Sequence, residues 1–344
     1  MSPAIFMIVL SSLATGTIIT MSSHHWLFAW IGLELNTLAM IPAISTPHNP
    51  RSTEAATKYF LTQASASAMI LFSSMTNAWQ TGTWDIINLS SMPAHIMLTL
   101  ALAMKLGLAP MHFWLPEVLQ GSTMTIALII STWQKLAPMT LIYMTINNLS
   151  TTILITLGLL STIIGGWGGL NQTQTRKIMA YSSIAHLGWM LSISSIMTNI
   201  MILNLTIYLI LTTTMFYLLI TTQSKTIQDT MTTWTLSPMM TSTMMILLLS
   251  LGGLPPLTGF IPKWLILNEL ITQNLIMLAS TMMVATLLSL FFYLRLTYTT
   301  TLTLPPNTTQ TKLKWRLKPN FPQLIMLMSS TSTLLLPMTP MILL

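Results

Sequence analysis

Long apolar stretches separated by short polar segments recur along the whole chain. None of them alternates in the way a barrel wall does, and an open sheet cannot satisfy its backbone groups in lipid. A helix needs about 20 apolar residues to cross a bilayer core. The pattern predicts eleven helices, which lie at residues 3–22, 26–45, 56–79, 94–121, 124–145, 150–170, 178–197, 200–222, 238–271, 274–298 and 323–343.

The composition supports this prediction, because 52% of the 344 residues are hydrophobic and only 6% are charged. A soluble domain carries about 25% charged residues, and the mean hydropathy here is +0.70. We therefore expect an all-α polytopic membrane protein, with residues 1–344 forming a single transmembrane domain. The chain has no Cys, which excludes thiolate-bound iron–sulfur clusters, thiolate zinc sites and disulfides. We expect no cleavable presequence either, since the first helix begins almost at Met1.

Basic residues fall on alternate loops when the chain is threaded through the eleven helices. Ten of the 13 lie on the side of the N-terminus, and the opposite loops carry none. This asymmetry is the positive-inside bias, and it predicts an N-terminus facing the matrix or cytoplasm. The polar stretch 299–322, with its KLKWRLK run, is suited to anionic lipids. The ten residues are Arg51, Lys58, Arg176, Lys177, Lys225, Arg295, Lys312, Lys314, Arg316 and Lys318.

The two over-long stretches resemble each other at a shift of 146 residues. LGLAPMHFWLPE at 106–117 superimposes on GGLPPLTGFIPK at 252–263, and a weaker match sets residues 58–69 beside 177–188. Pro and Gly break a helix and leave backbone groups unpaired. Paired broken helices in two halves mark ion or substrate paths in transporters; ordinary packing kinks are the alternative. We predict inverted-topology repeats at 26–145 and 150–298, followed by the basic loop 299–322 and a last helix at 323–343.

Three lysines lie inside the predicted helices: Lys105, Lys135 and Lys263. A lysine at the centre of a membrane helix costs about 2.5–3.5 kcal/mol. Glu34 supplies the opposite charge on the second helix. A nearby carboxylate favours the charged lysine while burial disfavours it, so such a group can load and release a proton. The alternatives are snorkelling to the interface and a static ion pair.

Two histidines, His112 and His186, fall on the fourth and seventh predicted helices and are candidate proton relays. A lone histidine inside a membrane helix is about as often a packing residue as a proton carrier. Glu117 ends the fourth helix near the basic face, where we expect its carboxylate to be solvated.

Six segments together resemble the subunit 2 family of NADH:ubiquinone oxidoreductase, respiratory complex I, in its animal mitochondrial form. The resemblance covers essentially the whole chain. Compared with the longer bacterial homologues, the resemblance implies that three N-terminal helices are missing, which leaves open what covers the face that they would occupy. The segments are IGLELN, KYFLTQASAS, MKLGLAPMHFWLPEVLQG, QKLAP, RKIMAYSSIAHLGWML and LSLGGLPPLTGFIPKW.

The resemblance implies an antiporter-like fold and a proton-pumping subunit of the membrane arm. Glu34 and Lys105 match the family's carboxylate and partner lysine, Lys135 its connecting lysine and Lys263 its distal lysine. No cofactor is expected in this chain, because NADH, FMN, iron–sulfur clusters and ubiquinone are bound by other parts of the complex.

The implied partners are other membrane-arm subunits, including the neighbouring antiporter-like one, and membrane lipids with cardiolipin as a candidate; nucleic acid is not expected. The implied location is the mitochondrial inner membrane, with the N-terminus in the matrix and the C-terminus in the intermembrane space. A stand-alone cation/proton antiporter and a passive membrane anchor are the competing hypotheses.

Overall fold

The computed structural model describes residues 3–302 and 329–333. These residues form helices and turns, with two isolated β-bridges and no strand. The chain divides into two compact units. The first unit comprises Met1–Ser161 and Met190–Thr198, and the second comprises Thr162–Trp189 and Asn199–Leu344.

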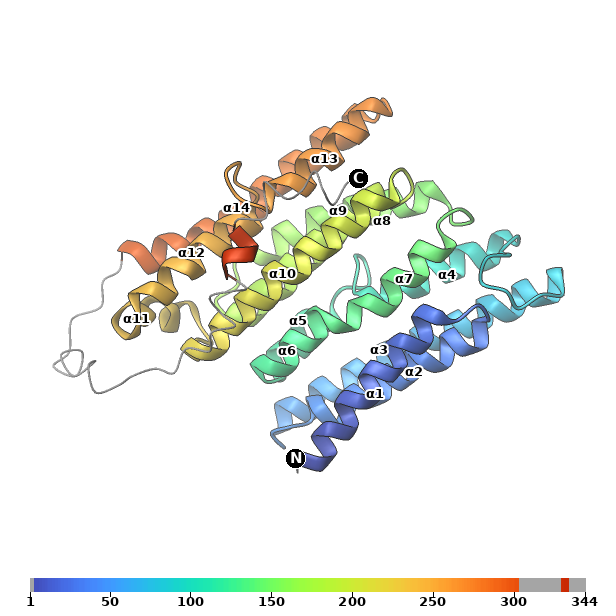
Figure 1. Cartoon of the computed structure of the whole chain (residues 1–344), viewed down its shortest axis with the longest axis horizontal. Helices are drawn as coiled ribbons and strands as arrows, with labels where there is room; N and C mark the ends of the chain where they lie inside the picture. Colours follow the sequence, from blue (N-terminus) through green and yellow to red (C-terminus); the bar gives the residue numbers. More distant parts are fainter. Residues whose placement is uncertain (1–2, 303–328, 334–344) are drawn as a thin grey trace. The chain divides into compact units, whose positions relative to one another are not determined.

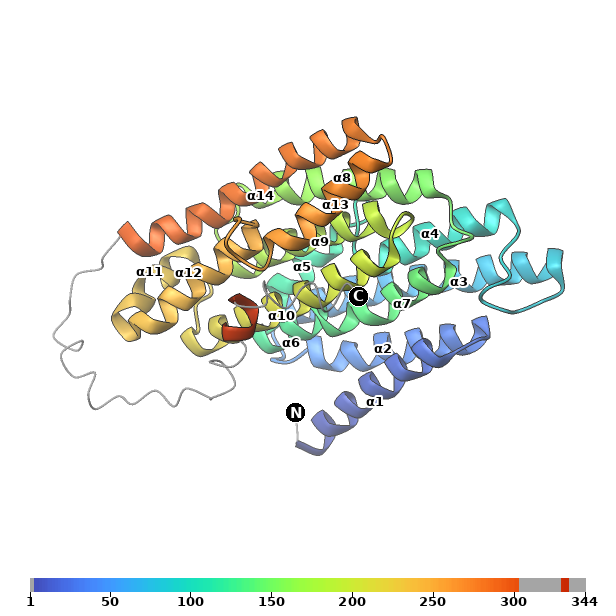
Figure 2. The same ribbon diagram turned by 45° about the horizontal axis from the view of Figure 1, so that its top comes forward.

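The first unit contains a bundle of long helices, of which α1, α2 and α3 lie side by side in Figures 1 and 2. α1 and α2 approach most closely where two glycines meet, since a Cβ on Gly16 would lie 2.9 Å from the carbonyl oxygen of Gly32. Small residues allow such close helix packing. The elements are α1 (Pro3–Ser22), α2 (Trp26–Ile44), α3 (Pro50–Thr81), α4 (Met92–Leu106), α5 (Trp114–Gly121), α6 (Met124–Ser131), the 3₁₀ turn η1 (Trp133–Lys135) and α7 (Leu136–Thr145).

The helix α3 begins six residues before the apolar pattern predicted. Pro50 occupies the first turn, where its missing amide is not needed. The backbone amide of Asn49 donates to Oγ of Ser52 at 3.1 Å. These polar positions start the helix without contributing to an apolar stretch, so hydropathy alone could not find them.

The second unit contains α10 to α14 and parts of two helices that cross the boundary between units. α12 and α11 both pack on α14. The elements are α8 (Thr151–Gly169), α9 (Thr175–Ser194), α10 (Thr198–Thr222), α11 (Ile227–Leu236), α12 (Pro238–Gly252), α13 (Phe260–Thr272) and α14 (Ile276–Leu302).

The helix α11 lies where the apolar pattern left a loop. Its start is a capping box, in which the Asp229 amide donates to the Thr226 hydroxyl and the Asp229 carboxylate accepts from the Thr226 amide. α10 and α11 separate α9 from α12, whereas α3 directly precedes α4. The weaker internal match, between residues 58–69 and 177–188, therefore gains no support from the order of the helices.

The fifth predicted helix coincides with the candidate membrane span Met124–Thr145, but its backbone is locally distorted. It is divided into α6 and α7 by the turn η1, and Thr132 has φ −115° and ψ −70°. The cause is Pro138, because a proline inside a helix clashes with the carbonyl four residues earlier, here that of Gln134. The fourth and ninth stretches are interrupted as predicted, between α4 and α5 and between α12 and α13.

Within the described residues, six helices are long and apolar enough to cross a membrane: Pro3–Ser22, Trp26–Ile44, Met124–Thr145, Thr151–Gly169, Thr198–Thr222 and Ile276–Thr301. The total of eleven stays a prediction. The last predicted helix, 323–343, lies largely outside the described residues, as does most of the basic loop 299–322.

Candidate functional site

The first break separates α4 from α5 and begins at Gly107, which has a φ of +76°. The Gly107 amide donates to the carbonyl of Met104 at 3.1 Å, and the Leu108 amide donates to that of Ala103 at 2.9 Å. This is a Schellman-type helix end, in which a left-handed glycine lets the chain turn back on the last helical carbonyls. The indole Nε1 of Trp114 donates to the same Met104 oxygen at 3.1 Å.

The second break, between α12 and α13, repeats this geometry 146 residues later. Gly253 has a φ of +84°. Its amide donates to the carbonyl of Ser250 at 3.0 Å, and the Leu254 amide donates to that of Leu249 at 3.3 Å. Every one of these positions matches its counterpart in the first break at the shift found in the sequence.

A lysine lies at each break, but the two are bound differently. Lys105 belongs to the last turn of α4, before its break, and its Nζ atom is buried with no hydrogen-bond partner among the described residues. Lys263 belongs to the first turn of α13, after its break. Its Nζ atom donates to the carbonyls of Gly252 at 2.8 Å and Leu251 at 3.4 Å.

Lys105 and Lys135 line one cavity in the first unit. Their exposed fractions are 6% and 3%, so neither side chain snorkels out of this unit. The space open to a water-sized sphere is about 10 Å³, which is close to the minimum for one water molecule. The cavity therefore admits water or a proton and excludes a bulky solute.

Glu34 lies near this cavity without lining it. Its carboxylate is close enough to interact electrostatically with Lys105. Among the described residues the two form no ion pair within hydrogen-bonding distance, because Oε2 of Glu34 and Nζ of Lys105 are both buried without a hydrogen-bond partner. A tight static ion pair, one of the alternatives for Lys105, is thus not what the structure shows.

A second cavity, in the second unit, brings His186 of α9 together with Lys263. Both side chains are buried, with exposed fractions of 8% and 9%. Tyr208 and Asn204 of α10 also line it. The rings of His186 and Tyr208 lie 5.5 Å apart, so a titratable ring and an ammonium group share one enclosed space.

His112, the other predicted relay, lies in the segment between α4 and α5 and not on a helix. Its Nδ1 atom is 3.2 Å from the carbonyl oxygen of Pro110, and the side chain is buried. It is not among the residues that line the cavity of Lys105.

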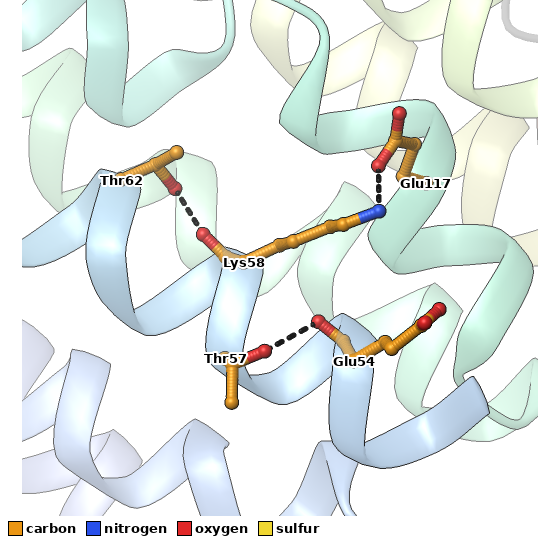
Figure 3. A network of polar contacts seen from close by, with 5 residues as sticks. All are labelled: Glu54, Thr57, Lys58, Thr62 and Glu117. Atoms are coloured by element: carbon orange, nitrogen blue, oxygen red, sulfur yellow. Dashed lines mark hydrogen bonds and ion pairs between the residues drawn. The ribbon is translucent and has the colours of Figure 1, made fainter. Parts of the chain in front are cut away.

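Glu117 is about half exposed, in agreement with the expected solvated carboxylate, and it also forms an ion pair. Its Oε2 atom lies 2.5 Å from Nζ of Lys58 on α3. Figure 3 shows the lysine reaching across from α3 to α5, with Glu54 nearby on its own helix. Both charged side chains are about half exposed, so the pair lies at the surface of the first unit.

Sequence reasoning missed the uncharged side chains around the first cavity. Asn36, Gln63 and Gln134 all line it, and each carries at least one buried polar atom with no hydrogen-bond partner among the described residues. The sequence did show amide side chains inside apolar helices, but a search for charged residues does not detect them. Within the described part of the chain, no three His, Asp or Glu side chains are grouped to bind a metal ion.

Comparison with known proteins places the chain in a family. Residues 23–289 match the family described as NADH:quinone oxidoreductase/Mrp antiporter, and residues 290–343 match the NADH dehydrogenase subunit 2 C-terminus. NADH-ubiquinone oxidoreductase chain 2 of Varanus timorensis is 58% identical over 99% of both chains. The chain belongs to the NADH-ubiquinone oxidoreductase chain 2 family.

Solved structures confirm the antiporter-like fold of this family member. A chain of respiratory complex I from Thermus thermophilus superimposes with a TM-score of 0.86 and 25% identity, over 98% of this chain and 79% of that one. A chain of the Mrp complex from Dietzia sp. gives a TM-score of 0.78 at 16% identity, over 88% of this chain and 62% of that one. The second likeness concerns the fold alone.

Proposed function

We infer that the chain is a proton-translocating subunit in the membrane arm of respiratory complex I, the NADH:ubiquinone reductase that couples electron transfer to proton pumping. Family membership supports this function, and so does the fold shared with a chain of bacterial complex I. NADH, FMN, iron–sulfur clusters and ubiquinone are then bound by other subunits. This chain contributes proton-carrying side chains and their enclosure.

The observation that carries the mechanism is the burial of Lys105 and Lys135 around one cavity beside a broken helix. The C-terminal end of a helix carries partial negative charge, which stabilises a cation near it. Lys105 lies in the last turn of α4. Its ammonium form is favoured by this helix end and by Glu34, while burial favours the neutral amine. Small changes in surrounding charge can therefore load or empty the group.

Lys263 and His186 give the second unit a corresponding proton site. The Lys263 ammonium donates to carbonyls at the C-terminal end of α12, which is where a helix end best stabilises a cation. His186 shares its cavity, and its imidazole is a candidate proton donor or acceptor. His112 lies outside the first cavity. We therefore propose a proton-relay role for His112 only at the segment that connects α4 with α5.

We also propose a membrane topology for the chain. Eleven membrane helices and two inverted repeats, each with one broken helix, are supported by the matched helix ends at Gly107 and Gly253. The distribution of basic residues supports an N-terminus in the matrix and a C-terminus in the intermembrane space, across the mitochondrial inner membrane. The basic loop 299–322 is suited to anionic lipids such as cardiolipin, and neighbouring membrane-arm subunits cover the remaining faces.

The test is proton translocation per NADH oxidised by assembled complex carrying Lys105→Met, a replacement close in volume that removes the charge. We expect assembly to persist while quinone reduction and pumping fall together. Lys225→Met is the matched control, because Lys225 is exposed in a loop. Unchanged pumping in Lys105→Met would make Lys105 a structural charge and favour the passive anchor.

A stand-alone cation/proton antiporter is the second candidate, since the matching family also includes Mrp antiporters. Gentle purification separates the two candidates. Co-purification of the chain with NADH:quinone activity is expected only for the complex I subunit.

A further inference from the structure

The second break is tied to the C-terminal part of the chain. The hydroxyl of Thr258, in the segment between α12 and α13, donates to the backbone carbonyl of Ser332. Residues 329–333, drawn in red in Figure 1, are the described part of the last predicted helix and belong to the second unit, as Thr258 does. Both residues have an exposed fraction of 1%. The hydrogen bond is therefore an internal contact between positions 74 residues apart.

The two partners belong to different parts of the family's sequence. Thr258 lies in the region 23–289, which matches the NADH:quinone oxidoreductase/Mrp antiporter family. Ser332 lies in the region 290–343, which matches the NADH dehydrogenase subunit 2 C-terminus. The hydrogen bond thus connects the antiporter-like part of the chain with the C-terminal part that is matched separately. The lysine mechanism described above makes no use of this contact.

The segment that carries Thr258 also packs tightly against α12. A Cβ on Gly259 would collide with the carbonyl oxygen of Ser250. The side chain of Lys263 donates to the next two carbonyls at the end of α12. Closely packed groups transmit a displacement to their neighbours because no free space absorbs it. A shift of this segment therefore reaches the hydrogen bonds of Lys263.

Thr258 also helps to set where α13 begins. Its backbone carbonyl accepts from the amide of Ile261 at 3.3 Å, and the carbonyl of Leu257 accepts from the amide of Phe260 at 3.1 Å. These bonds start the first turn of α13, to which Lys263 belongs. A displacement of Thr258 would move the start of α13, and with it Lys263, relative to the carbonyls of α12.

We propose that Thr258 is a positioning residue for proton transfer at Lys263, and that residues 329–333 hold it in place through the Ser332 carbonyl. This inference rests on the proposed function. The Thr258 hydroxyl keeps its proton, and the group that gains or loses a proton is Nζ of Lys263. Proton transfer depends on the distance and alignment between donor and acceptor. Loss of the hydrogen bond to Ser332 therefore slows the transfer while Lys263 itself is retained.

The decisive variant is Thr258→Val, which keeps the shape of the side chain and removes the hydroxyl. We expect NADH:quinone turnover per assembled complex to fall by about three- to tenfold, the effect of one hydrogen bond. The solvent deuterium isotope effect on turnover should rise, because proton transfer then limits the rate. Thr258→Ser, which keeps the hydroxyl, should retain most of the wild-type turnover. Thr241→Val is the matched control, because Thr241 is also 1% exposed and its hydroxyl donates to Pro238 within α12.

A second variant changes the other partner and leaves the break itself intact. Ser332→Leu places a larger side chain at a buried position and should displace residues 329–333 from Thr258. We expect the same fall in turnover and the same rise in isotope effect, so this variant replaces Thr258→Val if the latter does not assemble. Hydrogen exchange should accelerate at residues 253–261 in both variants and stay unchanged at the first break. A merely structural defect would lower the amount of assembled complex and leave the isotope effect of the remainder unchanged.

Wild-type turnover and an unchanged isotope effect in assembled Thr258→Val would overturn the inference, and so would an equal loss of turnover in Thr241→Val. Comparison with Lys105→Met identifies which statement has failed. Loss of pumping in Lys105→Met with no effect of Thr258→Val contradicts only the role of Thr258, whereas unaffected pumping in Lys105→Met contradicts the proposed function.

Discussion

The two breaks have the same backbone and different side-chain chemistry. At both, a left-handed glycine ends the helix and two amides turn back onto its last carbonyls. At the first break, the carbonyl of Met104 also accepts from the Trp114 indole, and Nζ of Lys105 has no hydrogen-bond partner among the described residues. At the second, the lysine itself donates to the helix end. A repeated backbone therefore does not imply a repeated environment for the proton carrier.

Glu117 and Lys263 occupy matched positions at the shift of 146 residues, and their environments differ even more than those of the two breaks. Glu117 lies on α5, half exposed and paired with Lys58, whereas Lys263 lies on α13, buried against the carbonyls of α12. The sign of the charge and its exposure both differ.

The largest expected difference between the breaks concerns stability after removal of each lysine. Lys263→Met leaves the carbonyls of Leu251 and Gly252 without their buried donor, which should cost about 1–3 kcal/mol. Lys105→Met removes a buried group that has no such partner and should leave stability unchanged or raised. The measurement is the thermal dissociation midpoint of the purified complex. Equal midpoints for the two variants would contradict the difference in lysine binding.

Alanine at the two glycines should separate backbone strain from displacement of the lysine. A left-handed conformation costs a non-glycine residue about 1–2 kcal/mol, so both Gly107→Ala and Gly253→Ala should lower the dissociation midpoint. A Cβ at Gly253 would also lie 2.9 Å from Nζ and Cδ of Lys263. At Gly107 it would lie 3.2 Å from the Trp114 ring and 3.5 Å from Cβ of Leu115. Pumping should therefore fall more in Gly253→Ala, and an equal loss in both would show that strain alone is responsible.

Trp114→Phe tests whether the only role of the Trp114 indole at the first break is to donate a hydrogen bond to the C-terminal end of α4. It removes the donor to the Met104 carbonyl while keeping an aromatic ring, so we expect a loss of about 1 kcal/mol in stability. The ratio of protons pumped to NADH oxidised should stay the same. A changed ratio would indicate that Trp114 takes part in proton transfer.

Acid should loosen the start of α11, an element with no counterpart in the first unit. Partial burial raises the pKa of Asp229, but hydrogen bonds from the amides of Thr226 and Lys225 outweigh it and hold the pKa below its ordinary value of 3.8. A carboxyl with a lowered pKa stabilises the fold above its unfolded pKa, and this stabilisation is lost as the pH falls through the folded value. The protection factors of the α11 amides, which correct for the intrinsic slowing of hydrogen exchange in acid, should fall as the pH falls from about 6 to about 3. Asp229→Asn should exchange faster at neutral pH and show less dependence on pH.

The smallest expected effect is at the Lys58–Glu117 ion pair. Both groups are about half exposed, and exposed pairs contribute little and are screened by salt. Glu117→Gln should change pumping and the dissociation midpoint slightly, and less at high ionic strength. A loss as large as that of Lys263→Met would mean that the two matched charges have equivalent roles.

The apolar pattern predicted most helices of the described residues, together with both broken stretches, because lipid requires long apolar runs and Pro and Gly interrupt them. It predicted residues 124–145 as one span, which the structure keeps, but it missed the local turn at η1, because one proline in an apolar helix produces anything from a slight bend to a break. It missed α11 because a capping box and a short polar helix carry no hydropathy signal. The lysines were found by charge, while Asn36, Gln63 and Gln134 were not, since an amide is conspicuous only when its atoms lack partners.

The sequence by itself determined that this is a helical membrane protein with three lysines inside its predicted membrane helices and a broken stretch repeated at a shift of 146 residues. Composition and spacing are local properties that a single chain displays directly. Only the tertiary structure decided that Lys105 shares its cavity with Lys135, that Lys263 binds the end of α12, and that Glu117 pairs with Lys58. These contacts join residues many positions apart, and their formation depends on how helices pack and which way each side chain points.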